Sequence, residues 1–566
     1  MSLDKDYLKD LFTDEVKGCL EGDSSLPKVT SKDDGKILKV VDGTWQLVDL
    51  VPPPYLSFLG NAEFTLNTGN NAKNWDGTLE YSTDTKTWNE WDGTAISSAG
   101  NNLYLRGTGN TKITGNSNQY SFIFTGTDYN LEVACKGNIE NLLDYETVST
   151  GGHPTMAEYC YAYMFEFCAS ITTAPELPAT TLAGHCYAYM FNNCNVLTTA
   201  PELPATTLAQ GCYENMFEFC NSLTSAPQLP ATMLANNCYQ GMFYGCTALT
   251  TAPALPATTL ADYCYQKMFT TCTSLTTAPE LPATTLAANC YAYMFNTCTA
   301  LATAPELSAT TLANNCYQKM FNNCTALTTA PALPATTLAN YCYDYMFYGC
   351  TALTTAPALP ATTLAEYCYE YMFYGCTDLT TAPALPATTL ADYCYAYMFY
   401  KCTALAKAPA LPATTLAANC YLNMFFGCTA LTTAPELSAT TLAANCCRAM
   451  FYGCTSLTTA KALLATTLAD QCYREMFYGC TSLVTVPALP ATTLANYCCQ
   501  NMFFGCKKIK LSTTQTGDYQ TAYRIPTSGA GTTATGALDG MFKNTGGTFT
   551  GTPSVNNTYY TSNTVV

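Results

Sequence analysis

Cysteine is the residue type with the widest chemical scope in this chain, and 28 of its 32 cysteines occupy two fixed positions eight residues apart. Thiols at such regular spacing could bind zinc, form disulfides or act as nucleophiles. Zinc held by mixed cysteine and histidine ligands is not expected, because the chain has only His153 and His185 and lacks a Cys-x-x-Cys pair. We therefore expect neither a metal nor a cofactor.

Disulfides within one cysteine pair are excluded if the intervening segment is helical, because residues eight apart are then separated by about 12 Å. Equivalent cysteines of neighbouring copies would stack about 5 Å apart, so distance alone leaves disulfides between copies open. Free cysteine is among the most buried residue types, and this favours buried free thiols.

Catalysis needs a nucleophile with a base, a pair of carboxylates or a bound metal. The recurring polar residues are threonine and cysteine without a histidine partner, and a glycine-rich phosphate loop is absent. Residues 55 to 135 contain no catalytic constellation either. The sequence therefore predicts a protein that is not an enzyme.

A cluster of tyrosines is the candidate binding site. Three tyrosines recur at the same positions of three consecutive copies and form a predicted three-by-three exposed patch: Tyr341, Tyr345, Tyr348, Tyr367, Tyr371, Tyr374, Tyr393, Tyr397 and Tyr400. Such rings, beside acidic residues, could stack on sugar rings and accept their hydroxyl protons; the acidic residues are Asp344, Glu366, Glu370 and Asp392. The alternative is that duplication copied a tyrosine-rich surface without a binding role.

These residues belong to fourteen consecutive 26-residue copies that fill residues 160 to 506, and a fixed period of this length predicts a solenoid. Each copy begins with Cys-Tyr-x-x-Met-Phe-x-x-Cys, except that Cys447 and Cys499 replace the tyrosine in two of them. On a helix, these five recurring residues fall within one arc of about 140°, and the variable residues point away from it. The following Leu-Thr-x-Ala-Pro stretch predicts a short parallel strand. Each repeat is thus expected to hold one short helix and one short strand, with the recurring aromatic residues in the core.

The order Cys-Tyr-x-x-Met-Phe-x-x-Cys-Thr-x-Leu-Thr-x-Ala-Pro resembles the BspA-like, Treponema-type leucine-rich repeats. The resemblance covers about three fifths of the chain, although cysteine and methionine replace the isoleucine and alanine of that family, and its usual unit is shorter. It implies an α+β leucine-rich-repeat solenoid with an adhesive or interaction role, and it implies no enzymatic activity.

Two modules precede the array. Residues 1 to 54 are expected to hold a helix, with Leu8, Leu11, Phe12 and Val16 on one face, and a hairpin that turns at Asp42-Gly43. Within it, residues 24 to 51, which contain the hairpin, resemble N-terminal regions of tailed-bacteriophage fibres and other virion-surface proteins. Residues 55 to 134 alternate strand and turn signals and predict a small all-β sandwich, which is similar to immunoglobulin-like domains.

The two ends of the array need caps, because a terminal repeat would otherwise expose apolar surface to water. Residues 135 to 159 are expected to cap the first repeat, which places the solenoid at 135 to 506. Residues 507 to 566 are expected to form a degenerate last repeat, marked by Arg524-Ile525-Pro526 and Gly540-Met541-Phe542, and a tail.

Only 11% of residues are charged and the net charge is −17, which disfavours nucleic acid and anionic membranes as partners. No apolar stretch is long enough to insert into a membrane, and the first twenty residues lack the apolar core of a secretory signal.

The leading hypothesis is a head or tail fibre on a bacteriophage virion, attached to capsid or tail proteins through its N-terminal segment and binding a glycan or protein of the host surface. A bacterial cell-surface adhesin and an intracellular scaffold are the alternatives. Virion fibres are commonly homotrimers, but no heptad run specifies an oligomer here.

Overall fold

The computed structural model describes residues 36–41, 44–49, 53–126 and 130–566. Strands β1 (Lys36–Val41) and β2 (Thr44–Asp49) pair antiparallel, with Val41 opposite Thr44, so the predicted hairpin strands are confirmed. The expected turn residues 42–43 and the expected helix face at Leu8, Leu11, Phe12 and Val16 lie outside the described residues.

Two sheets form the module that follows. The larger runs in the order β11-β10-β3-β8-β5-β6 and the smaller in the order β7-β4-β9. Phe58 of the larger sheet meets Phe124 of the smaller at a ring-centroid distance of 5.2 Å, so the sheets share one core. The strands are β3 (Leu56–Gly60), β4 (Phe64–Thr68), β5 (Thr78–Ser82), β6 (Asn89–Glu90), β7 (Ile96–Ser97), β8 (Asn102–Thr108), β9 (Phe122–Gly126), β10 (Val133–Lys136) and β11 (Ile171–Thr173).

The predicted immunoglobulin-like character of this sandwich is not confirmed. Strand β10 crosses the expected boundary at residues 134 and 135, and it pairs antiparallel with β3 and parallel with β11 of the first repeat. One sheet therefore continues from the sandwich into the array, so the first repeat begins on a preformed strand edge.

A cation stacked between two aromatic rings fixes the helix α3 (Asn141–Ser149) to the sandwich. The Arg106 guanidinium lies 4.1 Å from the Trp88 ring and 4.5 Å from the Tyr145 ring of α3, and its Nε donates to Glu80 at 2.8 Å. Cation–π contacts and a charged hydrogen bond together hold three elements with one side chain.

Replacing Arg106 with methionine should lower the stability of the sandwich by about 1 to 3 kcal/mol, because Glu80 loses its partner and the stack loses its charge. Chemical denaturation followed by tryptophan fluorescence measures this effect, and the exposed Lys86→Met variant is the control. Equal midpoints for the two variants would show that the stack is dispensable.

The segment from each first cysteine to the second is not a helix, so the predicted helix of each repeat is wrong. Every second N–H group closes a turn to the carbonyl three residues earlier, as in Asp344 to Tyr341 at 3.3 Å. The alternate N–H groups donate to the next repeat instead, as in Tyr345 to Glu370 at 2.9 Å. Five such bonds join a typical pair of repeats, from Tyr341, Tyr343, Tyr345, Phe347 and Gly349.

Left-handed backbone at every fourth residue explains why an α-helix does not form. The φ angles are +57° at Tyr341, +53° at Tyr345 and +69° at Gly349, and equivalent residues of other repeats share this conformation. A right-handed helix cannot pass through such residues. Asparagine and glycine recur there, as in Asn315 and Gly375, because they tolerate positive φ.

The predicted core is nevertheless confirmed. The recurring Cys, Tyr, Met, Phe and Cys side chains are buried, as in Cys368, Tyr369, Met372, Phe373 and Cys376. The phenylalanines stack face to face from Phe165 to Phe542 at 5.4 to 5.8 Å, with a tilt of at most 12° between planes. The array is thus a stack of identical layers.

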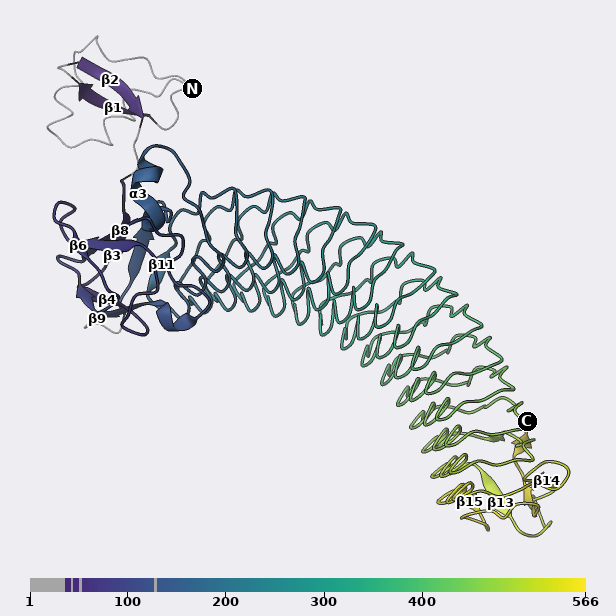
Figure 1. Ribbon diagram of the computed structural model, residues 1–566. Helices are drawn as coiled ribbons and strands as arrows, with labels where there is room; N and C mark the ends of the chain where they lie inside the picture. The colour runs from purple at the N-terminus through teal and green to yellow at the C-terminus, as the bar shows by residue number, and fades with distance from the viewer. Residues whose placement is uncertain (1–35, 42–43, 50–52, 127–129) are drawn as a thin grey trace, which may run out of the picture.

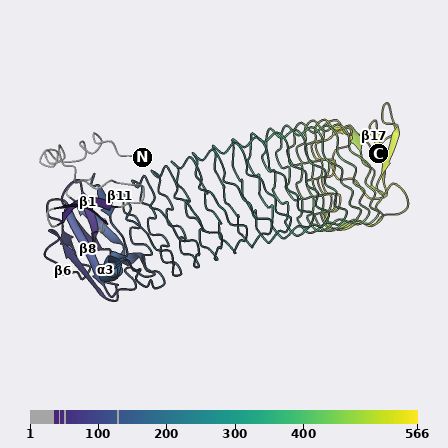
Figure 2. The same cartoon turned by 90° about the horizontal axis from the view of Figure 1, so that it is seen from above.

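The predicted strand of each repeat is reduced to an extended segment with isolated parallel bridges, such as Thr329 to Thr355 and Thr355 to Thr381. Within residues 160–506, regular strands occur at β11 and at β12 (Thr485–Val486). The proline that follows most of these threonines has no N–H group, so the ladder cannot extend. Figures 1 and 2 show the resulting curved rod, with the sandwich at one end and the C-terminus at the other.

Both ends of the backbone ladder are covered. At the first repeat, Ile113 and Phe122 of the sandwich donate their N–H groups to the carbonyls of Cys160 and Met164 at 2.9 and 2.7 Å. At the last repeat, the N–H of Phe503 reaches Met541 at 2.9 Å, so residues 535–543 add one more layer. Further strands close this end: β13 (Lys510–Ser512), β14 (Thr521–Arg524), β15 (Gly546–Gly547), β16 (Thr558–Thr561) and β17 (Thr564–Val565).

Candidate functional site

The nine candidate tyrosines form three stacked columns. The first column is Tyr341, Tyr367 and Tyr393, with ring centroids 4.6 and 4.7 Å apart. The second is Tyr345, Tyr371 and Tyr397, at 4.3 and 4.4 Å, and the third is Tyr348, Tyr374 and Tyr400, at 4.5 and 4.4 Å. The second and third columns also touch, as in Tyr371 with Tyr374 at 5.9 Å. The structure therefore brings these residues together in rows and columns.

All nine tyrosines are half-buried rather than fully exposed. Both faces of the middle rings, Tyr367, Tyr371 and Tyr374, are covered by the rings above and below. A ligand therefore meets ring edges and hydroxyl groups, which offer hydrogen bonds in place of the expected face-to-face stacking on sugars.

The third column is longer than the sequence reasoning recognised. It continues through Phe426, Tyr452, Tyr478 and Phe504 at 4.4 to 4.5 Å. The sequence feature that indicates this extension is the aromatic-Gly-Cys triplet, which recurs in these four repeats. The column crosses half of the array, so this part of the surface is a continuous aromatic ridge.

Two of the four expected acidic neighbours lie inside the patch. Asp344 is 3% exposed, its Oδ2 accepts a hydrogen bond from Gln318 Nε2 at 3.0 Å, and its Oδ1 has no partner. Burial raises the pKa of Asp344 to about 7. Burial, together with the charge of Asp344, raises the pKa of the half-buried Glu370 to about 8. Glu366 and Asp392 are exposed at the edge of the patch.

A lysine ends the second tyrosine column. Lys319 Nζ lies 4.5 Å from the Tyr345 ring and 5.2 Å from the Tyr293 ring. Its charge partly opposes the rise in the pKa of Asp344, yet the two groups form no ion pair among the described residues. The ring faces at this end of the column therefore already hold an ammonium group.

The cysteine columns are structural. In thirteen repeats the second cysteine donates its S–H to the phenylalanine carbonyl of the preceding repeat at 3.0 to 3.1 Å, as in Cys376 to Phe347. All 31 described cysteines are free and buried. Burial raises the pKa of the second cysteine of each repeat, to about 12 in Cys220 and Cys324. Such thiols are poor nucleophiles.

A thiol-specific chromogenic reagent should therefore leave the array cysteines of the native protein unmodified over an hour, and it should modify them all after denaturation. Cys19, which lies outside the described residues, is replaced by serine so that it does not contribute. Rapid modification of several thiols in the native state would contradict the buried columns.

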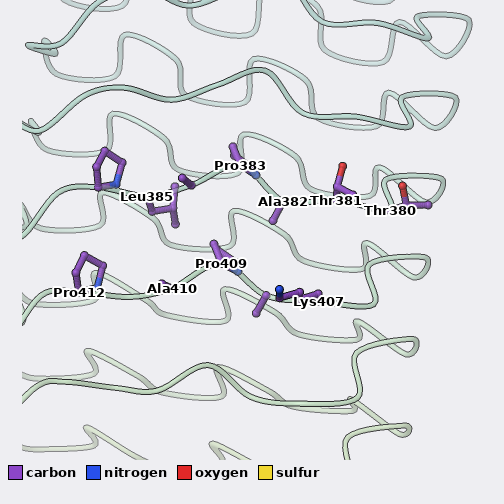
Figure 3. A pocket seen from close by; sticks show the side chains of 12 residues that line it. Thr380, Thr381, Ala382, Pro383, Leu385, Lys407, Pro409, Ala410 and Pro412 are labelled. Atoms are coloured by element: carbon purple, nitrogen blue, oxygen red, sulfur yellow. The ribbon is translucent and has the colours of Figure 1, made fainter.

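An open hollow of about 560 Å³ lies between the extended segments of two neighbouring repeats of the array (Figure 3). Pro383 and Leu385 line it from one repeat, and Pro409 and Pro412 line it from the next. Lys407 is the one charged residue among its lining residues. Thr380 and Thr381 add two hydroxyl groups at one end, and the rest of the lining is alanine, leucine and proline, which offers little to orient a small polar ligand.

The two histidines are held by carboxylates. His153 Nδ1 lies 2.8 Å from Glu140 Oε2, and His185 Nδ1 lies 3.2 Å from Glu214 Oε2. Among the described residues, no three histidine, cysteine or acidic side chains are placed to hold a metal ion. In this part of the chain, no helix is long and apolar enough to cross a membrane.

The fold and the patch define a repeat solenoid that presents an extended surface. A family model described as the BspA-type leucine-rich repeat region matches residues 158–302, 263–406 and 395–521. These matches cover more than half of the chain, which therefore belongs to the BspA-type leucine-rich repeat family. Repeats of this type are typical of surface-exposed, adhesin-type proteins. Comparison with curated proteins and with solved structures finds no match.

Proposed function

We propose that this protein is a non-enzymatic adhesion protein that is displayed on a surface and binds a host-surface glycan or protein through its repeat array. The tyrosine patch carries this proposal, because it places nine phenol groups in register on a rigid stack. Tyrosine is enriched in binding surfaces because it combines a large apolar ring with one polar group and few rotatable bonds.

A head or tail fibre of a bacteriophage is the setting that we propose. Its support is the likeness of residues 24 to 51 to virion-surface proteins, together with the β1–β2 hairpin formed there. A bacterial cell-surface adhesin has the same repeats and fits the array equally well. Antibodies against the array should label phage particles under the electron microscope; labelling of bacterial cells in a phage-free culture would establish the adhesin instead.

The role of the patch is tested by replacing Tyr371, Tyr374 and Tyr397 together with serine and measuring binding to host cells. We expect a loss of at least about tenfold in affinity, since several interface tyrosines are removed at once. A second triple variant, Tyr244→Ser, Tyr263→Ser and Tyr497→Ser, removes three tyrosines that lie outside the patch and its third column, and it serves as the control. Unchanged binding of the first variant would discard the patch.

A further inference from the structure

Glu370 and Asp344 are carboxylates that the fold leaves without adequate partners. Glu370 lies in the middle row of the patch, and its carboxylate makes no hydrogen bond or ion pair within the described part of the chain. Asp344 occupies the equivalent position one repeat earlier and keeps an unpaired, buried Oδ1. Carboxylates withdrawn from water are normally paired, so a buried and a half-buried one without partners in adjacent layers need an explanation.

Both carboxylates lie between two tyrosine columns in chain order. Glu370 follows Tyr367 and precedes Tyr371, and Asp344 has the same relation to Tyr341 and Tyr345. Burial is the main cause that raises the pKa of Tyr341 and of Tyr345. The negative charges of Glu370 and Asp344 raise both of these pKa values further. Among the described residues, neither carboxyl has an ion-pair partner in its ionised form, so a bound cation would supply the missing counter-charge and displace the proton.

Resting on the adhesive function proposed above, we propose that the tyrosine patch recognises a saccharide through a protonated amine, with Glu370 as the direct partner and Asp344 behind it. An unacetylated amino sugar is the class of ligand that fits. Its ammonium group would pair with Glu370, and its hydroxyl groups would meet the phenol groups of Tyr367 and Tyr371.

Three observations favour an ammonium group over other ligand chemistry. Lys319 already places an ammonium against the end of the second column, at Tyr345, so this aromatic surface accepts such a group. The exposed residues at the rim, Glu366 and Asp392, are also acidic and attract a cation. A metal ion is disfavoured because the described residues offer no cluster of three or more ligands.

The experiment measures binding of the full chain to glucosamine oligomers and to N-acetylglucosamine oligomers of equal length at pH 7. We expect the amine-bearing oligomer to bind about tenfold or more tightly, which corresponds to about 1.4 kcal/mol. Glu370→Gln should remove this preference. Glu366→Gln, which makes the same change of charge at the exposed rim, should largely retain it.

Equal binding of the two oligomers, or an unchanged preference in Glu370→Gln, would overturn the inference. Binding that disappears on addition of EDTA would also overturn it, because a metal ion would then carry the recognition. The two proposals can fail separately. If the triple tyrosine variant loses host-cell binding but the wild-type protein shows no preference for the amine-bearing oligomer, the adhesive function of the patch stands and the recognition of an amine is refuted.

Discussion

Phe373→Ala should lower the stability of the array by about 3 to 5 kcal/mol, because it leaves a cavity in a close-packed core. The Phe373 ring is fully buried and stacks on Phe347 and Phe399, at 5.6 Å in both directions. Because each repeat of a solenoid contacts only its two neighbours, the substitution weakens both of the interfaces that hold this repeat in the array. We expect thermal unfolding to begin at a lower temperature and limited proteolysis to cut near the substitution.

The exposed Thr354→Ala variant is the control for this experiment, because surface substitutions usually change stability by less than about 0.5 kcal/mol. Calorimetry and the proteolysis pattern should separate the two variants clearly. A Phe373→Ala protein that unfolds at the same temperature as the Thr354→Ala control would contradict the stacked core.

The stability of the array should fall as the pH rises from about 4 to about 8. The pKa of Asp344 is raised from 3.8 to about 7 in the folded protein, so between these values the folded state keeps a proton that the unfolded state has released. Unfolding is then favoured by increasing pH. Glu370, with its pKa raised to about 8, acts in the same direction.

Asp344→Asn should remove much of this dependence. Asparagine resembles the protonated acid, and its carbonyl can still accept the hydrogen bond from Gln318. Each pKa unit corresponds to about 1.4 kcal/mol, so at pH 8 we expect the variant to be more stable by about 2 to 4 kcal/mol. The gain should be small at pH 4, where Asp344 is protonated in the folded protein.

Denaturation midpoints at pH 4 and pH 8 measure this difference, and Glu366→Gln is the matched control on the exposed rim. The groups near Asp344 are Gln318, Lys319, Glu370, Tyr341 and Tyr345. Lys319 limits the rise in the pKa of Asp344 by its positive charge. If the wild-type protein is equally stable at both pH values, ionisation of Asp344 does not lower the free energy of unfolding, and this prediction is wrong.

The sequence predicted the period, the core and the position of the tyrosines without help from the structure. The 26-residue repeat requires equivalent residues to stack, and it thereby predicts that Tyr341, Tyr367 and Tyr393 lie in one column, as the structure shows. The buried Cys, Tyr, Met, Phe and Cys pattern was also read correctly. The exposure of the rings was not, because stacking at 4.3 to 4.7 Å covers faces that a single repeat would leave open.

The helix was wrong for a reason that lies in the pattern itself. Buried residues at positions 1, 2, 5, 6 and 9 fit a helical period of 3.6 and a turn period of four equally well over nine residues. The asparagine and glycine residues at every fourth position were the clue to left-handed backbone.

The sequence by itself therefore determined which recurring side chains face the core and which residues of successive repeats stack on one another. The tertiary structure decided where the backbone hydrogen bonds go, because an N–H group such as that of Tyr345 can pair within its own segment or with the next repeat. It also decided that Asp344 is buried and Glu370 half-buried between tyrosine columns, since burial of a variable residue depends on the layers above and below it.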